Sequence, residues 1–326
     1  LTRGPFPAGA LSAVTRRAAA VAEQTATRAS GMTRRGWILF AAMAVIWGIP
    51  YLFIKIAVEE ISPATVVGLR TVLGALVLVP LAMRSDALRP ALRAWPFVVA
   101  FGVIEMGIPW LLLGHAETRV ASGFAGLMLA AVPIVSTVLS FFLGDRHALA
   151  GIRILGLAAG ILGVGLLVGL DSLSGQVDPL SVVELLLVAV CYAVGPAIAS
   201  RKLGHVPSMG VIAVSLAIVG ILYLPVTAVG LSAGIPSTSV IVAVLVLALV
   251  CTALAFVLFF ELIGEAGPVR ATVITFVNPA VAVLLGIVVL SEPLTWGMVV
   301  GFPLVLLGSY WATRATRSEE PEVAPA

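Results

Sequence analysis

Ten runs of mostly apolar residues dominate the chain, and each is long enough to cross a bilayer. They cover residues 37–57, 64–83, 95–114, 120–143, 150–170, 180–200, 208–230, 239–262, 268–290 and 294–313. A helix that spans the hydrocarbon core needs about 20 such residues. The bilayer offers no water to unpaired backbone groups, and the runs lack the alternation typical of barrel strands. The sequence therefore predicts an all-α integral membrane protein with ten transmembrane helices.

The charged residues exclude a nucleic-acid partner and support a lipid bilayer as the surroundings. Only 11% of the 326 residues are charged, whereas soluble domains have about 25%. The 19 Lys and Arg residues lie between the apolar runs and in the N-terminal tail, and they form no basic stripe that could follow phosphates.

The positions of the positive charges predict the topology, because Lys and Arg in short loops stay in the cytoplasm. With a cytoplasmic N-terminus, the cytoplasmic side receives Arg34, Arg35, Arg84, Arg89, Arg93, Arg146, Arg153, Arg201, Lys202, Arg270, Arg314 and Arg317. The outer loops then keep Arg119 and the acidic residues Glu59, Glu60, Glu117, Asp171, Asp178 and Glu292. We expect a multi-pass protein of the plasma (inner) membrane with both termini in the cytoplasm.

The two ends of the chain have the composition of disordered cytoplasmic tails, at residues 1–36 and 314–326. The first 31 residues contain no apolar core long enough for a signal peptide. Met32 stands just ahead of the first apolar run, so we expect it to be the natural start.

The apolar part of the chain consists of two related halves. Pro196 follows Pro50, and Pro279 follows Pro133, in both cases by 146 positions. A constant offset at both ends of the chain indicates duplication. The predicted units, residues 37–170 and 180–313, contain five spans each. Because five is odd, the second unit enters the membrane from the opposite side, which makes the repeat inverted.

Several short motifs in this order resemble the drug/metabolite transporter superfamily, EamA type. They are Trp47-Gly48, Lys55, Pro63, Arg70, Pro133, Leu143–Asp145, Pro279, Leu290–Glu292, Gly301 and Gly308. The resemblance implies a ten-helix exporter of small metabolites, amino acids or drugs, often driven by an ion gradient. The chain departs from the family pattern at Asp145-Arg146, where a glutamate is usual, and at Glu105 in the third span.

Three charged residues inside the predicted spans are candidates for binding substrate or a coupling proton. Glu105 lies near the middle of the third run, where a charge needs a cavity or a partner. It either carries a proton or a cationic substrate group, or pairs structurally with Arg70 or Lys55. Arg70 is too deep to reach water easily, which favours pairing or substrate binding. Lys55 lies near a span end, where its long stem can carry the ammonium to the interface.

The four repeated prolines, Pro50, Pro133, Pro196 and Pro279, are candidates for helix kinks that expose backbone carbonyls to a cavity. The alternative interpretation is that these prolines serve helix packing alone, since proline is common in membrane helices. The symmetric pairing favours a central site between spans 1, 4, 6 and 9. Further candidate lining residues are Asn278, Trp47 and Tyr192.

No motif for catalysis, metal binding or cofactor binding is visible. Cys191 and Cys251 fall inside apolar runs, and the three histidines fall in predicted loops. We therefore expect no catalytic residues, no metal and no cofactor, and a secondary transporter that works by alternating access. The alternatives are a uniporter or exchanger of phosphorylated or nucleotide-linked metabolites, and a channel or non-transporting membrane scaffold. A homodimer is left open.

Overall fold

The computed structural model describes residues 32–313, except 146–148, 150, 174, 176 and 233. The described residues form helices joined by short connections and contain no β-strand. The predicted tails, apart from residues 32–36, lie outside the described residues. The prediction that Met32 is the natural start is therefore not tested by the structure.

Ten spans cross the bundle, as the apolar runs predict. In the first half they are built from α2 (Arg34–Ile46) with α3 (Pro50–Ala57), α4 (Pro63–Arg84), α6 (Trp95–Gly102) with η1 (Val103–Gly107) and α7 (Ile108–Glu117), α8 (Ser122–Leu129) with α9 (Val132–Phe142), and α10 (Ile152–Leu173). In the second half they are built from α11 (Pro179–Lys202), α12 (Ser208–Ser232), α13 (Thr238–Leu245) with η3 (Val246–Leu254) and α14 (Ala255–Ala266), η4 (Thr272–Phe276) with α16 (Asn278–Leu290), and α17 (Trp296–Thr313). The short helices α5 (Leu88–Arg93) and α15 (Pro268–Ala271) lie between spans.

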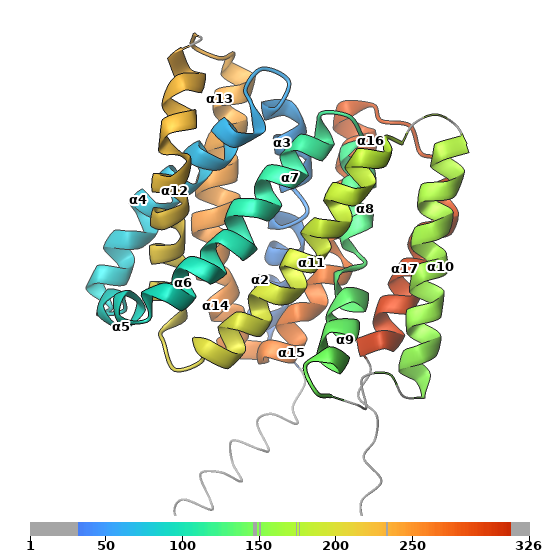
Figure 1. Ribbon diagram of the computed structural model, residues 1–326, viewed down its shortest axis with the longest axis horizontal. Helices are drawn as coiled ribbons and strands as arrows, with labels where there is room; N and C mark the ends of the chain where they lie inside the picture. The colour runs from blue at the N-terminus through green and yellow to red at the C-terminus, as the bar shows by residue number, and fades with distance from the viewer. Residues whose placement is uncertain are drawn as a thin grey trace, which may run out of the picture.

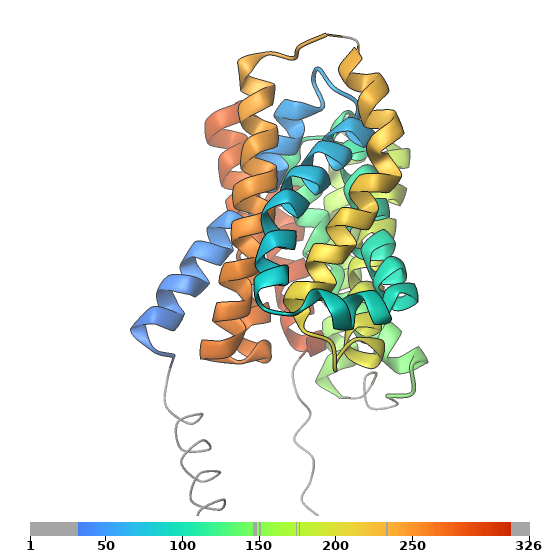
Figure 2. The same ribbon diagram turned by 90° about the vertical axis from the view of Figure 1, so that its left-hand side faces the viewer.

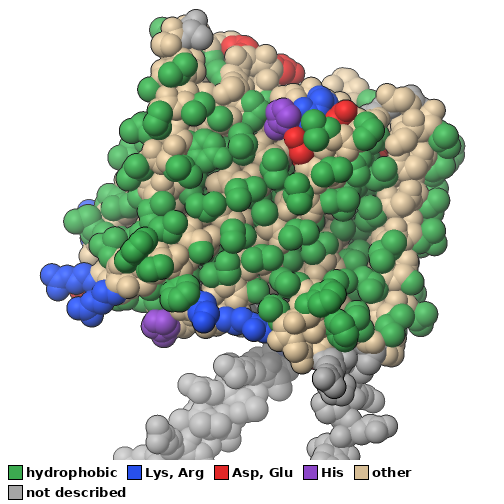
Figure 3. Space-filling model, in the orientation of Figure 1, with side chains coloured by type: hydrophobic (Ala, Val, Ile, Leu, Met, Phe, Trp, Pro, Cys, Tyr) green, Lys and Arg blue, Asp and Glu red, His purple; other side chains and the backbone are tan. Residues whose placement is uncertain are grey.

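The start of α2 and the end of α17 lie at the same end of the bundle (Figures 1 and 2). We call this the terminal end and the opposite one the distal end. Figure 3 shows a broad belt of hydrophobic side chains between them, with Lys and Arg side chains gathered near the terminal end of the visible face. Large apolar side chains of this belt, such as Leu76 and Ile221, are exposed. An apolar belt between two charged ends is the surface that a bilayer requires.

Three of the four repeated prolines stand where a span is interrupted. Pro50 begins α3, Pro133 lies in the first turn of α9, and Pro279 lies in the first turn of α16. A proline in the first turn costs no helical hydrogen bond, because that N–H has no partner within the helix. Pro196 differs, since it lies inside α11, which is a single helix from Pro179 to Lys202.

Two π-helical segments stand at equivalent places in the two halves, and sequence patterns did not indicate them. η1 interrupts the third span and η3 the eighth, and the repeat offset of 146 positions carries Glu105 onto Cys251. In η3, the Thr252 hydroxyl donates to the Leu247 carbonyl, 2.8 Å away and five residues back. Single π-helical turns inside helices occur frequently at functional sites.

The two halves also meet at their last spans, α10 and α17, which pack closely along their length. A Cβ atom at Gly163 would lie 2.6 Å from the Val305 nitrogen and 2.9 Å from the Gly301 carbonyl oxygen. Small residues allow membrane helices to approach to backbone contact. The glycines at repeated positions thus form a helix interface.

Candidate functional site

A single arginine lies at the centre of the polar residues inside the bundle. Arg70, on α4, is 6% exposed. Its Nε donates to the Thr252 hydroxyl of η3 at 2.8 Å, and its guanidinium carbon lies 3.7 Å from the ring centroid of Trp110 on α7. In the described part of the chain, no acidic side chain forms an ion pair with it. A buried guanidinium without a carboxylate partner can receive an anion from outside the protein.

Two tyrosines belong to the same cluster. The phenols of Tyr51, on α3, and Tyr192, on α11, both interact electrostatically with Arg70. Trp110 also contacts the Tyr192 hydroxyl. The Arg70 cluster, which we define as Arg70, Tyr51, Trp110, Tyr192 and Thr252, therefore joins residues of spans 1, 2, 3, 6 and 8. Its aromatic faces can pack against an apolar group while Arg70 binds a negative one.

Glu105 lies beside the Arg70 cluster in η1. Its Oε2 atom is buried and has no hydrogen-bond partner in the structure. The carboxyl group presses against Gly195 of α11, where a Cβ atom would overlap Oε2, and it interacts electrostatically with Tyr192. Glu105 forms no ion pair with Arg70 or Lys55, all of which lie in described segments. The structural pairing that the sequence left open is therefore absent in this conformation.

Lys55 is bound inside the protein rather than extended to water. Its Nζ donates to the carbonyl oxygens of Glu117 at 2.6 Å and Val120 at 2.8 Å. These carbonyls belong to the end of α7 and the turn before α8. Lys55 thus ties span 1 to the connection between spans 3 and 4, and two of its three N–H groups are already used.

Two other candidates from the sequence lie apart from the Arg70 cluster. Trp47 ends α2 and packs against Phe259 of α14, with ring centroids 4.7 Å apart. Asn278 begins α16, and its amide nitrogen, oriented to satisfy both groups, donates to Ile274 at 2.9 Å and Ala44 at 3.0 Å. Their contacts bind spans 1, 8 and 9 to each other.

Glu292 closes the distal end by capping another helix. Its carboxylate accepts from the Ser122 nitrogen at 2.7 Å, the Gly123 nitrogen at 3.0 Å and the Ser122 hydroxyl at 3.0 Å. These groups form the first turn of α8, where unpaired N–H groups favour a negative charge. These contacts are those of a helix cap.

A second polar network ties α7 to α11 near the distal end. Glu184 is 5% exposed and accepts from both Arg119 and His115. Arg119 also binds Asp178, whose pKa is lowered chiefly by hydrogen bonds from Ser181 and then by Arg119. The sequence had placed His115 in a loop. This placement is wrong, because α7 continues to Glu117, and His115 bonds to Glu184 from the last turn of that helix.

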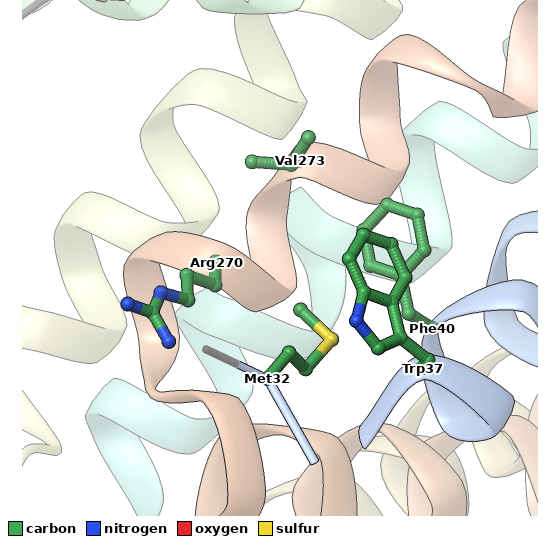
Figure 4. Close-up of a pocket in the computed structure, with 5 residues that line it drawn as sticks. All are labelled: Met32, Trp37, Phe40, Arg270 and Val273. Carbon is green, nitrogen blue, oxygen red and sulfur yellow. The ribbon is translucent and has the colours of Figure 1, made fainter. Parts of the chain in front are cut away.

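A cavity in the described part of the structure lies at the terminal end, away from Arg70. It measures about 340 Å³ and is lined by Met32, Trp37, Phe40, Arg270 and Val273. Figure 4 shows the Trp37 and Phe40 rings together at one side and the Arg270 guanidinium directed away from them. An apolar pocket of this kind suits a lipid chain better than a charged metabolite.

Sequence reasoning missed three members of this polar interior. Thr252 and Tyr51 gave no signal beyond being polar residues within apolar runs. Glu117 was assigned to an outer loop, because its run was expected to end at residue 114. The structure extends α7 to Glu117 and buries its side chain completely.

Comparisons with known proteins agree with this architecture. The EamA-like transporter family matches residues 34–169 and again residues 180–314. The inner membrane transporter YedA of Escherichia coli K12 is 31% identical over 279 residues, which cover 82% of this chain and 90% of that protein. A probable amino-acid metabolite efflux pump of Salmonella typhimurium LT2 is 25% identical over 297 residues, covering 86% and 95%.

A solved crystal structure shares the fold, with a TM-score of 0.60 and 20% identity, over 85% of this chain and 96% of that one. The family match covers both halves separately, as an internal duplication requires. Together with the ten spans and the paired helix interruptions, these matches establish that the chain belongs to the EamA-like transporter family.

Proposed function

We propose that the protein exports small organic acids, amino acids or related amphipathic metabolites by alternating access, and that it is coupled to protons. The observation that carries the proposal is the buried guanidinium of Arg70, which has an aromatic wall and no acidic partner among the described residues. A substrate carboxylate would supply the missing negative charge in a bidentate pair. The aromatic residues would contact the apolar part of the same molecule.

The position of the cluster supports transport around a site near the middle of the membrane. Arg70 lies within α4, and its partners come from both halves of the repeat. Sites of secondary transporters lie at repeat interfaces and are often built from interrupted helices. The efflux pump of Salmonella typhimurium, whose name refers to amino-acid metabolites, fits this class of substrate.

For the coupling proton we propose Glu105. An unpaired carboxyl group in the membrane interior is expensive when ionised, so such residues mark ion pathways by default. Glu105 interacts with Tyr192, which also interacts with Arg70. A proton on Glu105 and an anionic substrate on Arg70 can therefore influence each other through Tyr192.

The distribution of charge supports the terminal end as the cytoplasmic side of the inner membrane. At the terminal end of the bundle, the last turns of α4, α5 and α11 carry the basic residues Arg84, Arg93 and Lys202. Positive residues beside short loops remain in the cytoplasm. The distal end, which is capped by Glu292, then faces the outside.

A phosphorylated substrate is the weaker alternative. It requires several cations, and Lys55, the second candidate, is held by the carbonyls of Glu117 and Val120. The described part of the cluster contains one guanidinium, which matches one carboxylate.

Substrate flux into proteoliposomes tests the role of Arg70. Arg70→Gln should lower uptake of carboxylate substrates by about 10- to 100-fold, because a hydrogen bond to a charged group contributes about 1.5–3 kcal/mol. Arg35→Gln serves as the matched control, since Arg35 forms only exposed ion pairs. Equal flux of a carboxylate and its amide analogue through the wild-type protein would contradict the assignment of Arg70.

The same assay with an imposed proton gradient tests Glu105. Glu105→Gln should retain substrate exchange without a gradient and lose acceleration by the gradient, because glutamine keeps the shape and carries no titratable proton. An unchanged response of the variant to the gradient would remove Glu105 from the coupling mechanism.

A further inference from the structure

A second buried carboxyl group, Glu117, lies at the distal end and takes no part in the site described above. It is the last residue of α7 and has no exposed surface. Neither of its carboxylate oxygens has a hydrogen-bond partner in the structure. Buried polar groups are almost always hydrogen-bonded, so an exception calls for a specific explanation.

The charged neighbours of Glu117 are engaged elsewhere. Lys55 of α3 binds backbone carbonyls, including that of Glu117 itself, and forms no ion pair with the Glu117 carboxylate. Glu292 interacts with Glu117 across the distal end, but its oxygens are occupied by the first turn of α8. Tyr51 of α3 interacts with it as well.

The remaining packed elements form no ion pair with Glu117. On α11, Glu184 is bound by Arg119 and His115, and on α4, Arg70 forms no ion pair with Glu117. α8 contains no titratable residue. Glu105 belongs to the same span but lies twelve residues earlier, about 18 Å along the helix axis. Glu117 is therefore a separate group.

This environment suits a neutral carboxylic acid and opposes an ionised one. A buried carboxylate without a partner costs several kcal/mol, whereas the neutral acid loses only the hydrogen bonds of a polar group. When the distal end opens, water reaches Glu117 and can stabilise its ionised form. The ammonium of Lys55 is then the nearest cation. The closed and open conformations thus differ in their affinity for one proton.

We infer that Glu117 is a proton-binding site of the distal end, distinct from Glu105, which must be occupied for that end to close. On closing, a proton from the outer solution forms an O–H bond with the Glu117 carboxylate. On opening, this bond breaks and the proton returns to water, leaving the carboxylate near Lys55. External acid therefore favours the closed conformation. The assignment of the distal end to the outside rests on the proposed function, whereas the proton site itself does not.

A cysteine reporter between α8 and α16 measures closure directly. Val283 of α16 packs against Gly123 of α8, whose added Cβ would lie 3.2 Å from the Val283 Cα. Val283→Cys is introduced after replacing the two native cysteines, Cys191→Ser and Cys251→Ala, and is labelled with a membrane-impermeant thiol reagent. Thr238→Cys, at an exposed distal position, corrects for the effect of pH on thiol reactivity.

Labelling of Val283→Cys relative to Thr238→Cys should fall as the pH is lowered, by at most about tenfold per pH unit, as the uptake of one proton requires. Adding Glu117→Gln should give low labelling at every pH. Glu292→Gln should raise labelling throughout but keep its pH dependence. A Glu117→Gln protein that retains the parent's pH response overturns the proposal.

Lys55→Met provides a second, independent variant in case Glu117→Gln does not fold. Removing the ammonium favours neutral Glu117, so the midpoint of closure should move to higher pH. A midpoint that stays unchanged or moves to lower pH overturns the proposal. The labelling needs no substrate, so failure of the Arg70 flux test would leave this result intact, and the reverse also holds.

Discussion

The two ends of the bundle are related by the internal repeat, yet they are packed differently. At the distal end, α8 lies against α16, and Glu292 caps α8. At the terminal end, the equivalent elements are α9 and the segment formed by α15 and η4, and no comparable packing joins them among the described residues. Asp145, the repeat counterpart of Glu292, lies 3.6 Å from Arg153 instead.

Under the proposed alternating-access mechanism, this difference corresponds to a conformation that is closed at the distal end. An inverted repeat allows each half to adopt the arrangement of the other, and exchanging the two arrangements moves the opening from one side to the other. At the distal end, α8 packs on α16 and the half-buried Glu292 caps α8, whereas the terminal end is held by more exposed contacts. Breaking contacts at each end should therefore have unequal effects.

The largest difference in stability between the two ends is expected when one arginine is replaced at each end. Arg119→Met leaves buried Glu184 without its guanidinium, and the loss should lower the free energy of unfolding by about 2–3 kcal/mol, because an unpaired buried charge is costly. Arg35→Met removes ion pairs at the terminal end. The side chains of Arg35 and Glu261 are 64% and 44% exposed, so this loss should lower the free energy of unfolding by less than about 1 kcal/mol. Thermal unfolding in detergent compares the two, and equal losses would contradict the contrast.

The substitution Gly286→Val should open the distal end selectively. A Cβ atom there would overlap Glu292 Oε2 and lie 3.0 Å from the Ser122 hydroxyl. Gly286→Val should displace the cap and destabilise the closed form by about 1–3 kcal/mol, the usual cost of overpacking. The readout is increased labelling of Val283→Cys. As a control, Gly165→Val should leave labelling unchanged, because nothing lies near its added Cβ.

The repeat-related acids themselves give a smaller effect. Glu292→Gln should cost about 0.5–2 kcal/mol, as expected for a helix cap. Asp145→Asn should cost less, since the Asp145 side chain is 50% exposed in its pair with Arg153. High salt should reduce the effect of Asp145→Asn more than that of Glu292→Gln. Similar unfolding temperatures for the two variants at every ionic strength would show that the two positions are equivalent after all.

The smallest effect concerns acid stability of the distal connections. Hydrogen bonds from Ser237 lower the pKa of Glu60, and those from Ser181, with Arg119, lower the pKa of Asp178. A depressed folded-state pKa contributes stability above the ordinary carboxyl pKa, and this contribution is lost as pH falls through the depressed value. Asp178→Asn should therefore flatten the acid limb of a pH–unfolding curve slightly. An acid limb identical to that of the wild type would exclude this contribution.

The helices and their order could be predicted because each span carries its own signal. A run of apolar residues needs no distant partner to identify it, and all ten predicted runs correspond to observed spans. The third span is the instructive difference, since α7 continues to Glu117. Hydropathy alone ends the span before its first polar residues, whereas the structure continues the helix and buries Glu117 where α7 packs against α3 and α11.

The candidate site was predictable only in part. Glu105, Arg70 and Lys55 stood out because a charge within an apolar run must have a partner or a cavity. Which partner each one has could not be read from the chain, because the alternatives lie on other helices. Arg70 contacts Thr252 and Trp110 rather than Glu105, and Lys55 binds carbonyls rather than water.

Ten membrane spans, a duplicated architecture and the charged residues inside it could all be predicted from the sequence alone. These follow from hydrophobic length and from a constant offset, both of which are local or periodic properties. The tertiary structure was needed to show that α8 packs on α16 at the distal end, that Glu292 caps α8, and that the carboxylate oxygens of Glu117 have no hydrogen-bond partner. These contacts depend on which helices pack against each other. Lipid tails solvate every apolar helix surface equally well, so helix packing and buried polar contacts select the neighbours of each helix.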